Sequence, residues 1–386
     1  LGEIYIGLVT TMTEHYTNHG HLLIRNSDIK DGYFEFGENP IYLDEEFSEQ
    51  NKSRMHQLGD VITVHTGDIG TSAVIGDNEV NSIGFATIVT RPNQEVLDSD
   101  YFATYLNTDT HKQWAISMAT GDGRSNYNLK DYTKLVVPIP QIKEQKKIAA
   151  CIGNLNNLIT LHQRKLEHVK DLKKSMLQKM FPKNGQLYPE VRFPGFTDAW
   201  EQRKLGEVSE RVQGNDGRMG LPTLTISAAN GWMSQEARFS GNIAGKEQKN
   251  YTLLHKGELS YNHGNSKLAK YGTVFSLKTY EEALVPRVYH SFRMTEGDAS
   301  FIEYYFATKI PDRELAKLIS SGARMDGLLN IGFDEFMGIN INLPSIKEQE
   351  RISDYLRSLD SLITLHQREL DHLQLLKKGM LQQMFV

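Results

Sequence analysis

One long segment of this chain occurs twice, at a constant distance. Residues 142–181 read IKEQKKIAACIGNLNNLITLHQRKLEHVKDLKKSMLQKMF, and residues 346–385 read IKEQERISDYLRSLDSLITLHQRELDHLQLLKKGMLQQMF. The offset is 204 residues throughout, and 23 of the 40 aligned positions are identical. The same offset places Leu1-Gly2-Glu3-Ile4 on Leu205-Gly206-Glu207-Val208. A repeat of this length predicts a pseudo-twofold architecture, and therefore a target with approximate twofold character or two copies of one partner.

The repeat divides the 386 residues into two halves of equal length, 1–182 and 205–386, and a connector between them. In each half a diverged globular part precedes the repeated segment. We therefore expect five parts: a globular domain at 1–140, a helix at 141–182, a linker at 183–204, a second globular domain at 205–344 and a second helix at 345–386. The linker contains turn residues such as Asn184-Gly185 and aromatic residues such as Trp200, so we expect it to dock on a domain.

The repeated segments have the periodicity of long helices. Their apolar residues lie alternately four and three positions apart, which is the heptad seam of a coiled coil. The first seam runs through Ile148, Ile152, Leu155, Ile159, His162, Leu166, Val169, Met176 and Met180, and the second through Ile352, Leu356, Leu359, Ile363, His366, Leu370, Leu373, Met380 and Met384. Forty residues at ~1.5 Å each make a helix of about 60 Å.

Polar residues interrupt both seams at equivalent positions. His162 and His366 occupy one pair of seam positions, and Lys173 and Lys377 occupy another. Such residues fix the helix register and the choice of partner, extend their polar ends to the rim of the seam, or bind a metal. Register-setting is the favoured interpretation.

The globular parts contain short β-type runs, for example 61–64 and 285–292, separated by Gly, Asn and Asp. A helical stretch follows these runs in each half, at 101–118 and at 300–320. This pattern predicts mixed α/β domains of the α+β class. No apolar run approaches the ~20 residues needed to span a bilayer.

The charge is distributed unevenly along the chain. The net charge is −11 for residues 1–140, +7 for 141–204, −1 for 205–344 and zero for 345–386, which sums to the total of −5. An acidic first domain binds phosphates poorly by itself, so any role on nucleic acid requires local patches or a basic partner. The start, LGEIYIGL, is no signal peptide, and the single cysteine, Cys151, fits a reducing compartment, so we expect a cytoplasmic protein.

Sequence motifs for catalysis are missing. The chain has no GxGxxG, P-loop, HExxH or GxSxG motif, and no Asn-Pro-Pro-aromatic motif of amino-methyltransferases. His15, His19 and His21 have a spacing that could ligate a metal, but no matching carboxylate or cysteine pattern surrounds them, so a polar loop is favoured. We expect no catalytic residue and no metal site.

Polar, glycine-rich loops are the remaining candidates for function. Asn, Arg, Lys, Ser and Thr side chains can read base edges and phosphates, although ordinary surface loops also contain them. The candidate DNA contacts are Thr66, Asp68, Thr71, Arg124, Ser125, Asn126, Tyr127, Asn262, His263, Asn265, Lys267, Lys270 and Arg324.

Three features together resemble the specificity (S) subunit of type I restriction–modification systems. The first is two diverged domains, each followed by a nearly duplicated helix. The second is the entry to each helix, Pro140-Gln141-Ile142-Lys143-Glu144-Gln145 and Pro344-Ser345-Ile346-Lys347-Glu348-Gln349. The third is the connector, with Arg192-Phe193-Pro194-Gly195-Phe196 and Trp200-Glu201-Gln202-Arg203-Lys204-Leu205-Gly206-Glu207. Leu23-Ile24-Arg25-Asn26-Ser27-Asp28-Ile29 also resembles the entry of a target recognition domain in that family.

The resemblance implies two target recognition domains joined by an antiparallel coiled coil, each domain reading one half of a split, asymmetric DNA target. It implies that the helices dock two modification (M) subunits, which bind S-adenosylmethionine and flip an adenine for methylation. It also implies two restriction (R) subunits, which use ATP and Mg²⁺. Two recognition domains on one face of DNA read half-sites whose centres lie one helical turn apart, roughly 10 bp. The half-sites usual in the family have 3–4 bp, so the resemblance implies an unread gap of about 5–8 bp. The family carries a leader like 183–204 before its first domain, so we expect that a leader was trimmed before Leu1.

Two other classes of function were compared with this one. A scaffold protein would explain the long helices, but it would not explain two related globular domains. A self-contained DNA methyltransferase would need cofactor and catalytic motifs that the sequence lacks. A non-catalytic reader of DNA sequence therefore remains the leading hypothesis.

Overall fold

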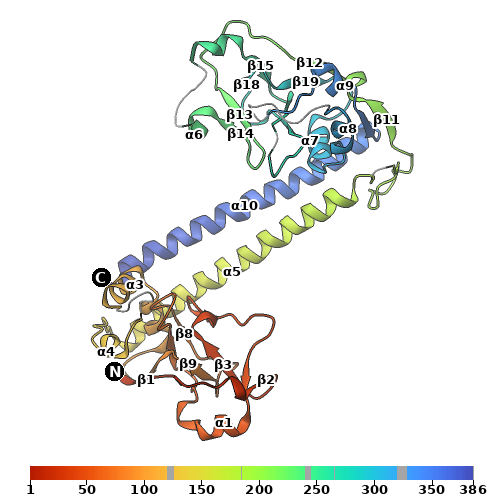
Figure 1. The fold of residues 1–386 in the computed structure, drawn as a ribbon. Helices are drawn as coiled ribbons and strands as arrows, with labels where there is room; N and C mark the ends of the chain where they lie inside the picture. The colour runs from red at the N-terminus through yellow and green to blue at the C-terminus, as the bar shows by residue number, and fades with distance from the viewer. Residues whose placement is uncertain (120–125, 184, 240–244, 265, 320–327, 386) are drawn as a thin grey trace. The chain divides into compact units, whose positions relative to one another are not determined.

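The structure is a computed structural model that describes residues 1–119, 126–183, 185–239, 245–264, 266–319 and 328–385. Its contacts divide the chain into two compact units. Unit 1 comprises Leu1–Gln163 and Gln367–Val386, and unit 2 comprises Arg164–His366. The long helices α5 (Ile142–Lys179) and α10 (Ile346–Met384) each contribute to both units (Figure 1).

Unit 1 is built on two four-stranded sheets. The first is antiparallel, in the order β1 (Gly2–Ile6), β10 (Ile88–Pro92), β7 (Val61–Thr63) and β8 (Ser72–Val74). The second has the order β2 (Tyr16–Thr17), β6 (Tyr42–Leu43), β3 (His21–Arg25) and β9 (Ile83–Phe85), with β3 and β9 parallel. The remaining elements are the hairpin β4 (Ile29–Lys30) and β5 (Tyr33–Phe34) and the helices α1 (Glu45–Gln50), α2 (Ser99–Leu106), α3 (Asp109–Met118) and α4 (Leu129–Tyr132).

Unit 2 has one four-stranded antiparallel sheet, in the order β12 (Ser209–Arg211), β19 (His290–Met294), β16 (Leu259–Asn262) and β17 (Thr273–Ser276). Three strand pairs accompany it: β11 (Glu201–Lys204) with β20 (Asn340–Leu343), β13 (Leu224–Ser227) with β14 (Gly231–Ser234), and β15 (Thr252–His255) with β18 (Glu282–Val285). Its short helices are α6 (Gln235–Phe239), α7 (Ala299–Ala307), α8 (Asp312–Lys317) and α9 (Phe333–Met337). Short 3₁₀ turns occur in both units, at Thr13–His15, Asn26–Asp28, Lys52–Arg54, Leu205–Glu207 and Gly245–Asn250.

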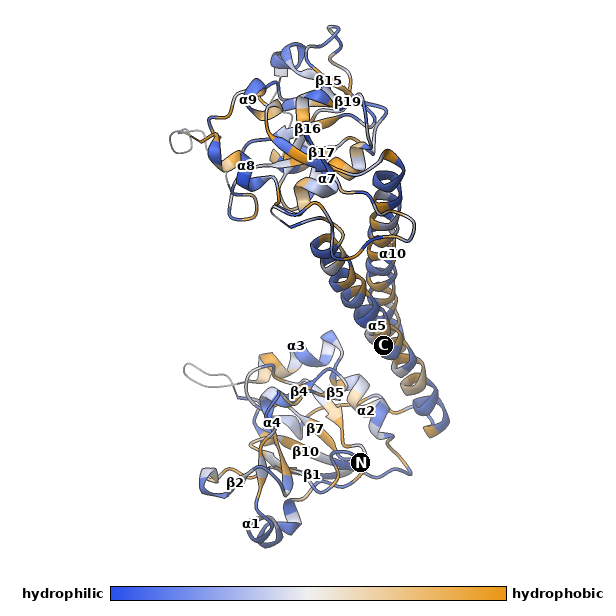
Figure 2. Ribbon diagram, turned by 90° about the vertical axis from the view of Figure 1, so that its right-hand side faces the viewer, coloured by the Kyte–Doolittle hydropathy of each residue, from blue (hydrophilic) through white to orange (hydrophobic). Residues whose placement is uncertain are grey.

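The two units share a framework although their globular parts differ in sequence. The antiparallel sheets have matching strand orders, β1-β10-β7-β8 and β12-β19-β16-β17, and a helix, α2 or α7, follows the last sheet strand in each. Strands β7, β10, β13, β16 and β18 are largely buried, and Figure 2 shows apolar residues concentrated in strands such as β10 and β17. The predicted mixture of helices and strands is confirmed. In the described part of the chain, none of the helices combines the length and the apolar content needed to cross a bilayer.

A buried glutamine fixes the start of each long helix to the globular part before it. The backbone N–H of Asp98 donates to Gln145 Oε1 at 2.9 Å, and Gln145 Nε2 donates to the Pro140 carbonyl at 2.9 Å. In unit 2, the Asp298 N–H donates to Gln349 Oε1 at 3.1 Å, and Gln349 Nε2 donates to the Pro344 carbonyl at 2.9 Å. Because Asp98 and Asp298 are also the N-caps of α2 and α7, each glutamine joins two helix starts.

The end of each repeat packs on the globular part of the other repeat. Phe181 closes the first repeat, yet it is only 1% exposed and lies in the core of unit 2, with its ring 5.4 Å from that of Phe301. Phe385 closes the second repeat, and its ring lies 5.2 Å from Tyr101 and 5.5 Å from Tyr105 in unit 1. Each unit is therefore completed by residues that come from the other half of the sequence.

The connector packs against unit 2. Trp200 is 1% exposed in the core of this unit, and Phe193 packs against the same core. Arg192 donates from Nε and Nη2 to the two carboxylate oxygens of Glu348, both at 2.7 Å. This bidentate pair ties the connector to the first turn of α10, and Glu348 itself is buried. Removal of one partner from such a buried pair typically destabilises a fold by about 3–5 kcal/mol.

The seam expected from the heptad pattern is the least exposed stripe of α5 and α10. In unit 1, His162 Nδ1 lies 2.9 Å from Glu369 Oε2, and Lys377 Nζ lies 3.1 Å from Asp31 Oδ2. In unit 2, Lys173 Nζ lies 2.5 Å from Asp360 Oδ1. In both units, residues late in one helix face residues early in the other, so the two helices run in opposite directions there. The lysines pair with carboxylates and do not extend to the rim.

The exchanged helix ends predict which unit a mutation destabilises. Phe181→Ala should lower the free energy of unfolding of unit 2 by about 3–5 kcal/mol, because it leaves a cavity in a closed aromatic core. Phe385→Ala should instead loosen unit 1. Hydrogen exchange should rise in α7 for the first variant and in α2 for the second. Phe239→Ala, at an exposed position of unit 2, is the control. Faster exchange in α2 for Phe181→Ala would contradict the exchange of helix ends.

Candidate nucleic-acid interface

In unit 1, three loops meet at the carboxyl ends of β3, β7 and β9. The parallel pairing of β3 with β9 puts Arg25 opposite Phe85. Asn26 then ties the loops together, because its Nδ2 donates to the Ala86 carbonyl at 3.0 Å and its Oδ1 accepts from the His65 N–H at 2.7 Å. The loops after these strands therefore form one polar edge, which we call edge 1.

The segment 126–127 adds to edge 1. The Thr66 hydroxyl donates to Asn126 Oδ1 at 2.7 Å, and the Tyr127 N–H donates to the His65 carbonyl at 2.9 Å. Two loops that the sequence separates by about sixty residues are thus side by side, held by one side-chain and one backbone bond. Half-burial lowers the pKa of His65, so its imidazole tends to stay neutral at this edge.

Unit 2 has a matching arrangement, which we call edge 2. Leu329 N–H donates to the His263 carbonyl at 2.9 Å, as Tyr127 does to His65 in unit 1. Asn262 Nδ2 donates to the Ile226 carbonyl at 3.3 Å, which connects the end of β16 to the end of β13. Both ring nitrogens of His263 face carbonyls, those of Leu329 and Val288, so this histidine holds three loops together.

The two edges differ in charge. At edge 2, Arg238, Lys267, Lys270 and Arg287 are exposed, and none of them forms an ion pair with any residue that the structure describes. At edge 1, the exposed charged residue of the loop after β7 is Asp68, which accepts a hydrogen bond from Thr71 at 2.7 Å. Edge 2 therefore attracts phosphate, whereas edge 1 offers mainly neutral polar groups.

The structure distributes the predicted DNA contacts over three environments. Asp68, Lys267 and Lys270 are exposed, and Thr66, Asn126 and Asn262 are half-buried. Thr71, Tyr127 and His263 are buried. Arg124, Ser125, Asn265 and Arg324 lie outside the described residues.

The three buried side chains need a different interpretation. Tyr127 belongs to an aromatic cluster, where its hydroxyl lies 3.3 Å from His111 Nε2, and burial lowers the pKa of that histidine to about 4. Thr71 serves the turn through Asp68, and His263 binds backbone carbonyls. A side chain with so little accessible surface supports the loop rather than touching DNA, so we exclude these three residues from the candidate contacts.

Sequence reasoning missed Asn26, Arg238 and Arg287 as members of the two edges. Asn26 is a short polar residue directly after an apolar strand, and this signal was present in the sequence. Arg238 reaches edge 2 because Nη1 donates to the Ile226 carbonyl at 2.8 Å. Its place there depends on the pairing of β13 with β14, which the spacing along the chain does not reveal.

Comparisons with known proteins agree with this architecture. A family model described as type I restriction modification DNA specificity domain matches residues 15–171 and 197–375. The MjaVIII type I restriction enzyme specificity subunit of Methanocaldococcus jannaschii is 21% identical over 350 residues, which cover 85% of this chain and 78% of that protein. The EcoBI specificity subunit of Escherichia coli is 24% identical over 174 residues, or 44% of this chain and 36% of that protein.

A solved structure has the same fold. The crystal structure of the type I restriction-modification system S subunit from M. genitalium matches with a TM-score of 0.59 and 12% sequence identity. The match covers all of this chain and 94% of that one. At this identity the match supports the fold, whereas the family assignment rests on the sequence match over most of the chain.

The charge of edge 2 predicts how its lysines contribute to DNA binding. Removing two phosphate contacts with Lys267→Ala and Lys270→Ala should weaken duplex binding to all sequences alike. It should also reduce the slope of log K against log salt by about 1.8, near 0.9 per contact. Titrations of labelled duplexes at several salt concentrations measure both effects. Lys256→Ala is the control, because Lys256 precedes β16 at its other end and pairs with Glu281 at 2.6 Å. A changed sequence preference with an unchanged slope would contradict phosphate binding.

Proposed function

The chain belongs to the family of type I restriction-modification DNA specificity subunits, and we propose that it reads a split, asymmetric DNA target. The observation that carries this proposal is a repeated framework with two unlike edges. The two units share a strand order and the clamp by Gln145 or Gln349, but they differ in the charge of their loops. Two units with the same strand order but differently charged loops would recognise two different half-sites, so we expect an asymmetric target and not a palindrome.

Each edge would read bases through short polar side chains and loop backbone. Thr66 and Asn126 offer hydroxyl and amide groups at edge 1, where Asn26 holds the loops together, and such groups can pair with base edges in the major groove. Edge 2 adds lysine and arginine side chains, which would bind phosphates and orient the duplex. Because edge 1 lacks comparable cations in its described loops, we expect weak DNA binding by the isolated chain and much tighter binding when a basic partner is present.

The long helices offer two matching surfaces for partners. The segment LITLHQR occurs at 158–164 and again at 362–368. Leu158 and Leu161 are 43% and 46% exposed, and their equivalents Leu362 and Leu365 are 41% and 49% exposed. Residues three positions apart lie on one side of a helix, and these four leucines are outside the seam. Two identical apolar surfaces support the docking of two copies of one partner, the modification subunits.

The chemistry would belong to the partners. In this proposal the modification subunits bind S-adenosylmethionine and methylate adenine, and two restriction subunits supply ATP- and Mg²⁺-dependent translocation and cleavage. This chain would then have no catalytic residues. It would act in the cytoplasm, together with these partners and the chromosome. The antiparallel helices would serve as a coiled-coil spacer that leaves an unread gap of about 5–8 bp between half-sites that lie roughly one DNA turn apart.

The proposed function predicts the pattern of DNA methylation. Cells that express this chain with its modification subunits should methylate one bipartite motif with two unlike half-sites. Methylome sequencing with and without the chain measures this. Insertion of one helical turn into both α5 and α10 should lengthen the gap and leave both half-sites unchanged. Altered half-site letters, or methylation that does not depend on the chain, would contradict the proposal.

The repeated leucines predict the stoichiometry of the complex. Leu158→Gln with Leu161→Gln should remove one modification subunit, and Leu362→Gln with Leu365→Gln should remove the other. These leucines are less than half exposed, so further burial of each is worth about half of the ~1.5–3 kcal/mol for a fully exposed side chain, and each pair should weaken its site by about tenfold to a hundredfold. Native mass spectrometry reports the copies bound. Leu375→Gln is the control, since this exposed leucine stands where the first repeat has Asp171. Two copies bound to both double variants would rule out these surfaces.

A further inference from the structure

The roots of the two domains, where each meets the long helices, can be compared residue by residue. Asp98 and Asp298 cap α2 and α7, so Thr104 and Tyr304 occupy the same place in their helices. The offset of 204 makes Asn156 the equivalent of Asp360, and Lys377 the equivalent of Lys173. Both roots therefore have a lysine at this position. The other two positions differ, with Thr104 and Asn156 in unit 1 and Tyr304 and Asp360 in unit 2.

In unit 2 these three positions form a closed polar cluster. Asp360 on α10 binds Lys173 Nζ on α5 at 2.5 Å and accepts from the Tyr304 hydroxyl on α7 at 2.7 Å. The Lys173 ammonium also lies 5.5 Å from the centre of the Tyr304 ring. Burial, and then the bond to Asp360, raise the pKa of Tyr304, so its hydroxyl stays protonated and donates. One cluster thus joins the domain helix to both long helices.

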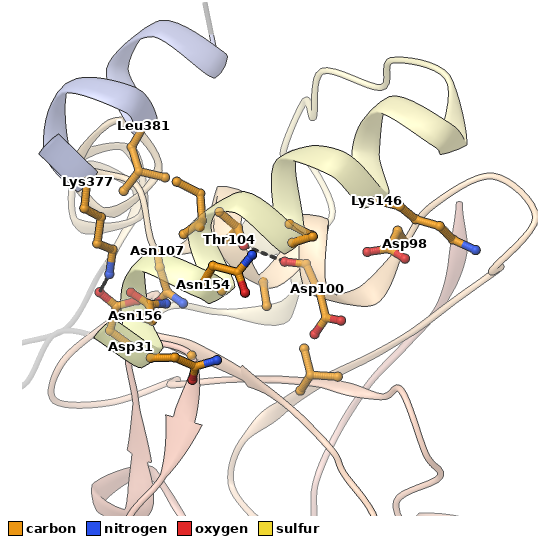
Figure 3. Close-up of a pocket in the computed structure, with 18 residues that line it drawn as sticks. Asp31, Asp98, Asp100, Thr104, Asn107, Lys146, Asn154, Asn156, Lys377 and Leu381 are labelled. Atoms are coloured by element: carbon orange, nitrogen blue, oxygen red, sulfur yellow. Dashed lines mark hydrogen bonds and ion pairs between the residues drawn. The ribbon is translucent and has the colours of Figure 1, made fainter. Parts of the chain in front are cut away.

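In unit 1 the same three positions line a cavity. Thr104, Asn156 and Lys377 border a space of about 520 Å³, and Ala103 stands where unit 2 has Glu303 (Figure 3). The Lys377 ammonium turns to Asp31, in the turn between β4 and β5, at 3.1 Å. The Thr104 hydroxyl donates to its own helix, to the Asp100 carbonyl at 2.6 Å. The α2 helix therefore lacks the bridge that α7 makes through Asp360.

We propose that Lys173, Asp360 and Tyr304 are positioning residues that fix the seating of the second recognition domain on the long helices, and thereby the half-site spacing that is accepted. The inference rests on the proposed function, because spacing has meaning only for a bipartite target. The root of unit 1 has a cavity in place of this cluster, and its equivalent lysine, Lys377, binds Asp31 of the domain instead.

The geometry of DNA explains why such a cluster affects spacing. One extra base pair moves a half-site by about 3.4 Å along the axis and turns it by about 35°, because a turn has 10–10.5 bp. To read a half-site at the wrong gap, a recognition domain must shift or tilt on its root. A charged bond that spans α5, α10 and α7 resists that movement, and its loss lowers the penalty for the wrong gap.

The test uses the full complex with its modification subunits and a plasmid library in which fixed half-sites flank gaps of different length. Asp360→Asn, which gives unit 2 the side chain that unit 1 has at this position, should raise methylation at gaps one base pair too long or too short, relative to the native gap, by about tenfold. That is the loss expected for one charged hydrogen bond. Tyr304→Phe, which keeps the ring, should produce a smaller rise in the same ratio.

Two further variants separate positioning from folding. Asp354→Asn breaks an exposed pair with Arg357 on α10 and should leave the ratio unchanged. Thr104→Tyr combined with Asn156→Asp should fill the cavity of unit 1 and lower methylation at wrong gaps. Equal losses at every gap for Asp360→Asn, or an unchanged ratio, would overturn the inference while the bipartite motif stands. Absence of a bipartite motif in the unmodified complex would instead overturn the proposed function and this inference with it.

Discussion

The packing of each helix end on the other repeat's domain is the constraint on which the rest of the structure depends. Phe181 fills the aromatic core beside α7, and Phe385 packs beside α2. Gln145 and Gln349 bind the opposite ends of the same helices to the domains that precede them. Each domain is thus held by the start of one helix and the end of the other, so neither half of the sequence forms a complete unit by itself.

This constraint accounts for where the two halves resemble each other. The residues that meet at a root, such as the Glu-Gln entry and the Met-Phe end of each helix, recur at the offset of 204. The loops of edge 1 and edge 2 lie at strand ends and, over their described residues, make no such contacts, so they can differ without disturbing the framework. A fixed framework and free loops are what a family of readers with different targets requires.

Sequence reasoning predicted the parts whose signals are local. The seam follows from a period that neighbouring residues carry, and its stripe is buried as expected. The contacts between Phe181 and Phe301 join distant segments, so spacing alone did not reveal them. Tyr127, one of the candidate DNA contacts, is buried, and its sequence context did not reveal this. A glycine-rich polar loop precedes it, but its ring packs against those of Trp114 and Tyr132.

Because the two roots differ, substitutions at equivalent positions should affect the two units differently. A substitution in the cavity of unit 1 meets open space beside Ala103 and Thr104, whereas one at Tyr304 breaks a bridge between three helices. Unit 1 can therefore accept larger side chains at its root without unfolding, and its seating can be tuned by filling that space. Because edge 1 also lacks lysine and arginine in its described loops, unit 1 depends on shape and neutral hydrogen bonds where unit 2 uses charge. The second domain would then anchor the duplex and set the spacing, and the first would contribute mainly discrimination between bases.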